Sequence, residues 1–187
     1  MIKYLLLAIV FVSGSLLFGF RKAPNVKIAP ASVERKVKKE KFKDDFKWLS
    51  YDEAVKLNSK KPRKIFIDVY TDWCGWCKKM DKATLSNPKI TGYLKEKYYA
   101  VKLNAESNKM IKYKGKEMTE AQLARNVFGA TGFPTTVYLD SEENLLQPIP
   151  GYMEVDILDK ILHYYGEDHY KTTTWEQFQR NYDSGMN

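Results

Sequence analysis

The feature that most constrains the fold is a pair of cysteines, Cys74 and Cys77, which comes shortly after a largely apolar segment. That segment, residues 65–70 (IFIDVY), is rich in β-branched and aromatic side chains, which is typical of a strand covered on both faces. The residues after Cys74 favour a helix as far as Leu85. The cysteine pair is therefore predicted to lie where a buried strand gives way to a helix.

This position predicts which cysteine reacts first. Unpaired backbone N–H groups and the positive end of the helix dipole stabilise a thiolate at a helix N-terminus, so its pKa falls below the free value of about 8.5. We therefore expect Cys74 to be the nucleophile and Cys77, carried into the first helical turn, to be the shielded resolving thiol. Attack by Cys74 on a disulfide gives a mixed disulfide, which Cys77 then cleaves.

Helix and strand signals alternate after Trp48 and predict an α/β domain. Capping boxes at Ser50 and Thr119 each start a helix. Asn87 followed by Pro88 starts another. Besides residues 65–70, strands are expected at residues 98–104, 135–139 and 145–147, the last two as a hairpin, and a closing amphipathic helix at residues 155–165.

The N-terminus is typical of a targeting segment. Lys3 precedes an apolar run, residues 4–20, and Arg21 and Lys22 follow it. Residues 1–20 are therefore predicted to be a signal peptide or an N-terminal membrane anchor. Either alternative predicts an extracytoplasmic chain, periplasmic or secreted, in a compartment where disulfides persist.

Residues 21–47 are rich in lysine and proline and are predicted to be a basic flexible linker. They carry a net charge of +6, against +8 for the whole chain, so the remainder is close to neutral. A near-neutral domain without a nucleic-acid motif argues against binding to nucleic-acid phosphates.

The cysteine segment, residues 67–78 (IDVYTDWCGWCK), resembles the active-site strand and loop of thioredoxins. The buried acid of that family, six residues before the nucleophile, corresponds to Asp68, and its partner lysine on the next strand corresponds to Lys102. Its cis-proline corresponds to Pro134, and Gly151 fits the glycine before its last helix. The W-C-G-W-C-K motif is similar to that of a secreted subgroup and departs from the cytosolic proteins, which usually have proline between the cysteines.

The resemblance covers residues 48–166 and implies a thioredoxin-like domain, in which helices flank a central mixed β-sheet. Residues 105–118 exceed the minimal fold and are expected to form a surface loop near the active-site end. Residues 167–187 are predicted to be a helical C-terminal extension. Behind a cap formed by Thr173 and Glu176, an apolar stripe is expected to pack on the domain through Trp175, Phe178 and Tyr182.

The resemblance also implies roles for the residues of the site. Asp68 relays protons to and from Cys77, and the backbone beside Pro134 pairs with a substrate strand. Trp73 and Trp76 flank the cysteines and are expected to form an apolar docking rim. The predicted catalytic residues are Cys74, Cys77, Asp68 and Lys102, and the predicted substrate-binding residues are Trp73, Gly75, Trp76, Phe133 and Pro134.

The predicted function is reduction of protein disulfides by a thiol–disulfide oxidoreductase whose only redox group is the Cys74–Cys77 pair. Expected partners are protein thiols and disulfides, together with a membrane electron-donor reductase. A disulfide-forming oxidase, an isomerase and a redox-silent interaction module remain alternatives, as does copper binding by the cysteines with Met80. No metal is expected: a closed zinc site needs four ligands, and the next histidine lies 86 residues after Cys77.

Overall fold

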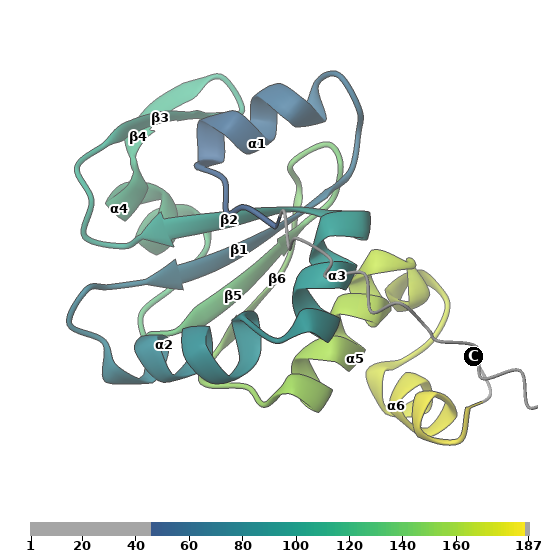
Figure 1. Cartoon of the computed structure of the whole chain (residues 1–187). Helices are drawn as coiled ribbons and strands as arrows, with labels where there is room; N and C mark the ends of the chain where they lie inside the picture. Colours follow the sequence, from purple (N-terminus) through teal and green to yellow (C-terminus); the bar gives the residue numbers. More distant parts are fainter. Residues whose placement is uncertain (1–45, 186–187) are drawn as a thin grey trace, which may run out of the picture. The chain divides into compact units, whose positions relative to one another are not determined.

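The computed structural model describes residues 46–185 (Figure 1). The predictions for residues 1–20, and for nearly all of the linker at residues 21–47, fall outside this part of the chain. No helix within residues 46–185 is long and apolar enough to cross a membrane.

In chain order the elements are α1 (Tyr51–Asn58), β1 (Lys64–Tyr70), α2 (Gly75–Met80), the π-helical turn η1 (Asp81–Leu85), α3 (Pro88–Lys97), β2 (Tyr98–Asn104), β3 (Met110–Tyr113), β4 (Lys116–Thr119), α4 (Glu120–Gln122), the π-helical turn η2 (Leu123–Val127), β5 (Thr135–Leu139), β6 (Leu145–Pro150), α5 (Val155–Gly166), the 3-10 turn η3 (His169–Lys171) and α6 (Trp175–Asp183).

The central sheet is mixed, as predicted. Its strands lie in the order β2-β1-β5-β6, with β1 parallel to β2, β5 antiparallel to β1 and β6 antiparallel to β5. The segment before α1 extends the sheet, because Leu49 forms a parallel bridge with Val101 on β2. Helices cover both faces: α1 and α4 lie on one side of the sheet, and α2, α3 and α5 lie on the other (Figure 1).

Alternation along β1 explains why the strand is apolar throughout. Ile65, Ile67 and Val69 belong to the core layer shared with α1 and η2. Phe66 belongs to the second layer, shared with α2, α3 and α5. Successive side chains of a strand point to opposite faces, so Asp68 shares the face of Phe66, which is covered by the helix that carries the cysteines.

The predicted helix starts are confirmed. Ser50 caps α1 in a capping box with Glu53, and Thr119 caps α4 in the same way. Asn87 caps α3, with Pro88 in its first turn. The helix predicted after Cys74 is present but changes at residue 81 from α-helical to π-helical hydrogen bonding.

Two boundaries differ from the expectations. Residues 105–118 are not a plain loop, because β3 and β4 pair there as an antiparallel hairpin turning at Lys114 and Gly115, both with positive φ. Turns with positive φ at both central residues match the twist of paired strands. The hairpin of β5 and β6 also differs, because β6 continues beyond residue 147 to Pro150. Proline lacks a backbone N–H, and an edge strand such as β6 tolerates it because the outward N–H groups of an edge strand need no partner.

The C-terminal residues pack on the domain, as predicted. Phe178 of α6 is only 1% exposed, and its ring lies 5.2 Å from that of Tyr164 on α5. The Tyr182 hydroxyl donates a hydrogen bond of 2.6 Å to the buried carboxylate of Asp159. The helix cap is shifted by one residue from the prediction, since Thr174 caps α6 together with Gln177.

This packing makes α6 part of the stability of the domain. Phe178→Ala should lower the free energy of unfolding by about 3–5 kcal/mol, the usual cost of emptying a buried phenylalanine site. Urea unfolding measures the loss, and Glu176→Ala, an exposed position on the same helix, is the matched control and should change it by less than about 0.5 kcal/mol. Equal, small effects of both variants would mean that α6 is not held to the domain in solution.

Candidate active site at the Cys74–Cys77 disulfide

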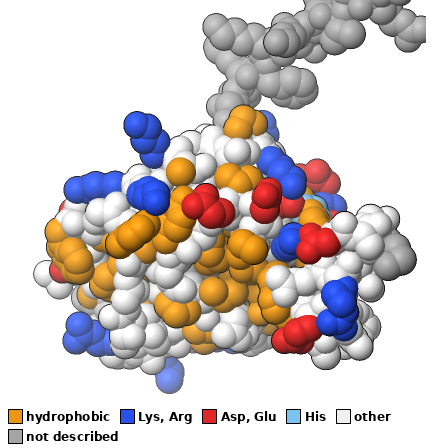
Figure 2. All heavy atoms as spheres, turned by 90° about the horizontal axis from the view of Figure 1, so that it is seen from below, with side chains coloured by type: hydrophobic (Ala, Val, Ile, Leu, Met, Phe, Trp, Pro, Cys, Tyr) orange, Lys and Arg blue, Asp and Glu red, His pale blue; other side chains and the backbone are white. Residues whose placement is uncertain are grey.

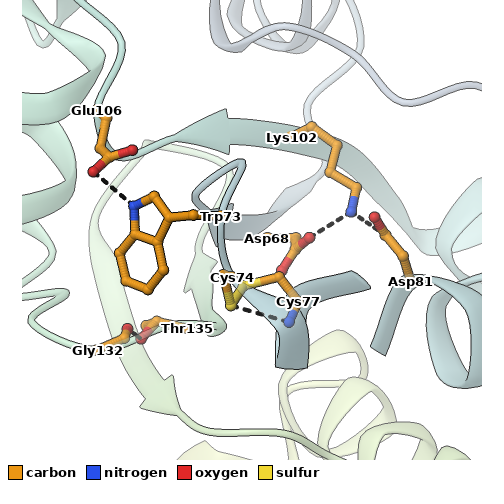
Figure 3. Close-up of a disulfide and its surroundings, with 9 residues drawn as sticks. All are labelled: Asp68, Trp73, Cys74, Cys77, Asp81, Lys102, Glu106, Gly132 and Thr135. Atoms are coloured by element: carbon orange, nitrogen blue, oxygen red, sulfur yellow. Dashed lines mark hydrogen bonds and ion pairs between the residues drawn. A yellow bond between two sulfur atoms is a disulfide. The ribbon is translucent and has the colours of Figure 1, made fainter. Parts of the chain in front are cut away.

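Cys74 and Cys77 form a disulfide at the junction of β1 and α2, where the sequence placed them. Cys74 is the N-cap residue of α2, and its sulfur accepts a hydrogen bond of 3.0 Å from the backbone N–H of Cys77 (Figure 3). A donor directed at this sulfur stabilises a thiolate there after reduction. The geometry thus supports Cys74 as the nucleophile.

The two cysteines are covered almost equally in the oxidised form, with 4% of Cys74 and 5% of Cys77 exposed. Burial therefore does not separate their roles. The difference between them comes from the helix. Cys74 precedes the first turn and its sulfur accepts a hydrogen bond, whereas Cys77 lies within that turn and its backbone N–H donates this bond.

A partly buried cluster of ion pairs lies on the face of β1 that α2 covers. The β1–β2 register places Asp68 opposite Lys102, as the resemblance implied, and the Lys102 ammonium lies 2.5 Å from Oδ2 of Asp68. The same ammonium also pairs with Asp81, at the start of η1 (Figure 3). Asp68 is almost completely buried, whereas Asp81 is half exposed. Lys102 thus links a buried carboxylate to one at the surface.

Burial raises the pKa of Asp68 above its usual value, and the nearby Lys102 ammonium opposes this rise only in part. The other carboxylate oxygen, Oδ1, is buried and has no hydrogen-bond partner among the described residues. This oxygen is the one on which a proton can reside without breaking the bond to Lys102. The arrangement is suited to a group that takes up and gives back a proton.

Asp81 was not identified from the sequence, although a signal for it exists. It lies four residues after Cys77, so a continuous helix brings the two positions to one face. The pattern of an acid two turns beyond the first cysteine, combined with a lysine on the neighbouring strand, points to a shared ion pair.

One side of the disulfide is bordered by Trp73, which is 68% exposed. Its indole N–H donates a hydrogen bond of 2.9 Å to Glu106, and its ring lies edge-on to Phe133 at 6.2 Å. Figure 3 shows the indole between Glu106 and the segment that contains Gly132 and Thr135. The hydrogen bond to Glu106, a residue that was not predicted, fixes the orientation of the Trp73 ring.

The peptide bond between Phe133 and Pro134 is cis, as predicted.

The other side is bordered by Trp76, which is 57% exposed. Its ring lies 5.4 Å from that of Tyr152, and the Lys79 ammonium sits over both rings at 4.6 and 4.7 Å. Tyr152 was not predicted, because only the fold brings the segment before α5 next to α2. Lys79 was not predicted either, although it lies three residues after Trp76 on α2 and helical spacing places the two on one face. Figure 2 shows the face of the molecule below the sheet, where hydrophobic side chains gather in the middle and charged ones lie mostly around them.

Two further residues of α2 differ in burial: Gly75 is exposed and Met80 is buried. Gly75 is exposed, and a Cβ built on it would meet no atom within 4 Å, so space alone does not require glycine there. Met80 is fully buried in the core layer that contains Phe66. Within residues 46–185 no group of three His, Cys, Asp or Glu side chains is arranged to hold a metal ion.

The family model of the thioredoxin-like domain matches residues 51–166. Among curated proteins, the thiol:disulfide interchange protein DsbD of Haemophilus influenzae is 25% identical over 108 residues. The match covers 56% of this chain but only 17% of that protein.

Solved structures show the same fold. A thioredoxin-fold protein from Helicobacter pylori superimposes with a TM-score of 0.54 at 21% identity, covering 67% of this chain and 83% of that one. For a thioredoxin from Thermus thermophilus the TM-score is 0.52 at 21% identity, with 63% and 85% covered. A DsbH oxidoreductase gives 0.52 at 20% identity, with 65% and 85% covered. Each is similar to the mixed sheet and flanking helices described above.

Proposed function

The chain belongs to the thioredoxin-like family and is a thiol–disulfide oxidoreductase with one C-x-x-C pair, and from this premise we propose that it reduces the disulfides of other proteins outside the cytoplasm. The observation that carries the proposal is the disulfide at the N-terminus of α2, bordered by two exposed tryptophans and placed beside a buried carboxylate. Such a site offers a reactive sulfur, a docking surface and a proton acceptor within one loop and one helix turn.

The proposed reaction begins with the reduced pair. The Cys74 thiolate attacks one sulfur of a substrate disulfide, so that a mixed disulfide forms and the other substrate sulfur leaves as a thiolate. Cys77 then transfers its proton to Asp68 and attacks the sulfur of Cys74. The Cys74–Cys77 disulfide forms again, the second substrate thiolate leaves, and two electrons have passed to the substrate.

The charges around the pair favour the reducing direction. A strongly oxidising pair is one whose reduced form is unusually stable, chiefly through stabilisation of the thiolate. Trp76 contributes no charge between the cysteines, and the positive charge of Lys102 is shared by two carboxylates, Asp68 and Asp81. Little positive charge is left to stabilise a thiolate, so the reduced pair gives up its electrons more readily.

The reduction potential tests this direction. We expect the pair to have a potential below about −200 mV, on the scale where thioredoxin lies near −270 mV and strong oxidants near −120 mV. Equilibration of the purified protein with glutathione buffers measures it. A value near −120 mV would assign the protein to disulfide formation instead, since that gap of about 80 mV corresponds to about 4 kcal/mol for two electrons.

The location and the electron donor complete the proposal. The apolar run at residues 4–20, flanked by basic residues, supports export of the chain, with residues 1–20 as a signal peptide or an anchor. Residues 21–47 would then act as a linker to the domain that begins at residue 48. A reductase is oxidised in each cycle, so we propose that a membrane electron-donor reductase restores the dithiol.

A further inference from the structure

A cavity of about 290 Å³ opens next to the Trp73 side of the disulfide. We propose that this cavity binds an acidic side chain of the substrate polypeptide, with Arg125 as the residue that recognises its carboxylate. The inference rests on the proposed function, because it concerns which protein disulfides the site selects. The cavity is lined by Ala105, Ala124, Arg125, Ala130, Thr131 and Phe133.

The cavity is connected to the reactive pair through Phe133. This residue precedes Pro134, and its ring packs against Trp73, the residue before Cys74. When a substrate strand pairs with the backbone of this loop, as the resemblance to thioredoxins implies, its alternate side chains point to opposite sides. Side chains on one of those sides, a short distance from the substrate cysteine, reach the cavity lined by Thr131 and Phe133.

The lining fits one side chain of a polypeptide. Three of its six residues are alanines, so the side chains along much of the wall are small, while Arg125 and Thr131 make part of it polar. The backbone N–H of Ala130 donates a hydrogen bond of 2.9 Å to the carbonyl of Ala124, which ties the loop before Phe133 to the first turn of η2. Because its volume is at the lower limit of small-molecule pockets, the cavity matches a side chain better than a separate ligand.

Arg125 supplies the charge that selects the side chain. It is exposed on η2, and its guanidinium has no hydrogen bond or ion pair with any described residue. Glu106, which follows the lining residue Ala105, accepts the hydrogen bond from Trp73 instead of pairing with Arg125. A guanidinium binds a carboxylate through two parallel hydrogen bonds, and a cavity that holds the carboxylate beside the guanidinium reduces the screening of that pair by water. The unpaired cation at the edge of this small cavity therefore favours Glu or Asp over neutral side chains.

Single-turnover reduction of defined peptides tests the inference. The pre-reduced protein is mixed with cyclic peptides closed by one disulfide, in which a single Glu is moved along an alanine flank, and with the same peptides carrying Gln. We expect the Glu peptide to be reduced about fivefold faster than its Gln partner at one or two positions, which corresponds to about 1 kcal/mol. The preference should shrink as salt is added.

Variants separate Arg125 from other charges. Arg125→Gln should bring the Glu-to-Gln rate ratio to about one, and Arg125→Glu should reverse the preference toward a Lys peptide. Arg180→Gln removes the same charge from the exposed face of α6 and should leave the ratio unchanged. Equal rates for Glu and Gln at every position, or a preference that survives Arg125→Gln, would overturn the inference. Failure of the unaltered protein to reduce any of the peptides would instead overturn the proposed function.

Discussion

Cys77→Ser should hold substrates as mixed disulfides on Cys74, whereas Cys74→Ser should hold none. Cys74 caps α2, and its sulfur accepts a hydrogen bond from the backbone N–H of Cys77, so this sulfur is the one stabilised as a thiolate. Without the Cys77 thiol, the mixed disulfide has no internal group to cleave it. Turnover should fall by about a thousandfold or more in both variants, because the two thiols act as one unit.

The trapped species distinguishes the two variants. A small disulfide-bonded protein is incubated with each reduced variant, free thiols are alkylated in acid, and adducts are separated without reductant and identified by mass. The double variant Cys74→Ser/Cys77→Ser is the control for adducts formed elsewhere. Trapping by Cys74→Ser at least equal to that by Cys77→Ser would reverse the assigned roles.

The elements of the fold could be predicted because their signals are local. The capping boxes at Ser50 and Thr119 place side chains that bond to backbone groups within one helical turn. The apolar run of β1 reports its burial on both faces. By contrast, half of the residues of β3 and β4 are polar, and only Ile111 of the hairpin is buried in the core. Short strands without apolar alternation leave little for a pattern to detect.

The centre of the site could be predicted for a different reason than its border. Cys74 and Cys77 lie in one turn, and the resemblance to thioredoxins implied the pairing of Asp68 with Lys102, which the register of β1 and β2 confirms. Glu106 and Tyr152 reach the two tryptophans from 33 and 76 residues away in the chain. No local pattern specifies which loop of an α/β domain lies beside another, so these contacts required the structure.

Asp68→Asn should slow turnover near neutral pH by about a hundredfold, the usual effect of removing a general base. In the proposed cycle Cys77 must lose its proton before it attacks the mixed disulfide, and we assign that proton to the buried Asp68 carboxylate, which Figure 3 shows next to the cysteine pair. The unaltered protein should show a rate that rises with pH through the raised pKa of Asp68. In the variant this rise should be lost, and the residual rate should climb only at higher pH, where the thiol ionises unaided.

The same substitution should stabilise the fold at neutral pH. The pKa of Asp68 is raised in the folded protein, chiefly by burial, so the folded state holds a proton that the unfolded state releases. The stability cost is absent below the unfolded pKa of about 3.9, grows as pH rises toward the folded pKa and is complete above it. Urea unfolding should therefore show Asp68→Asn to be more stable at pH 7 and similar to the unaltered protein near pH 3. A variant less stable at pH 7 would mean that the bond to Lys102 outweighs burial.

Asp81→Asn provides the matched comparison, because it removes a carboxylate from the same ammonium without touching the buried acid. Asp81 raises the pKa of Asp68, so its loss leaves Lys102 to Asp68 alone and should lower that pKa. The rise of the rate with pH should then move to lower pH, while the rate at pH 7 stays within a fewfold of the unaltered value. A purely structural role for the cluster would change stability without moving the pH profile. An unmoved profile in Asp81→Asn, together with an unchanged rate in Asp68→Asn, would exclude Asp68 as the proton acceptor.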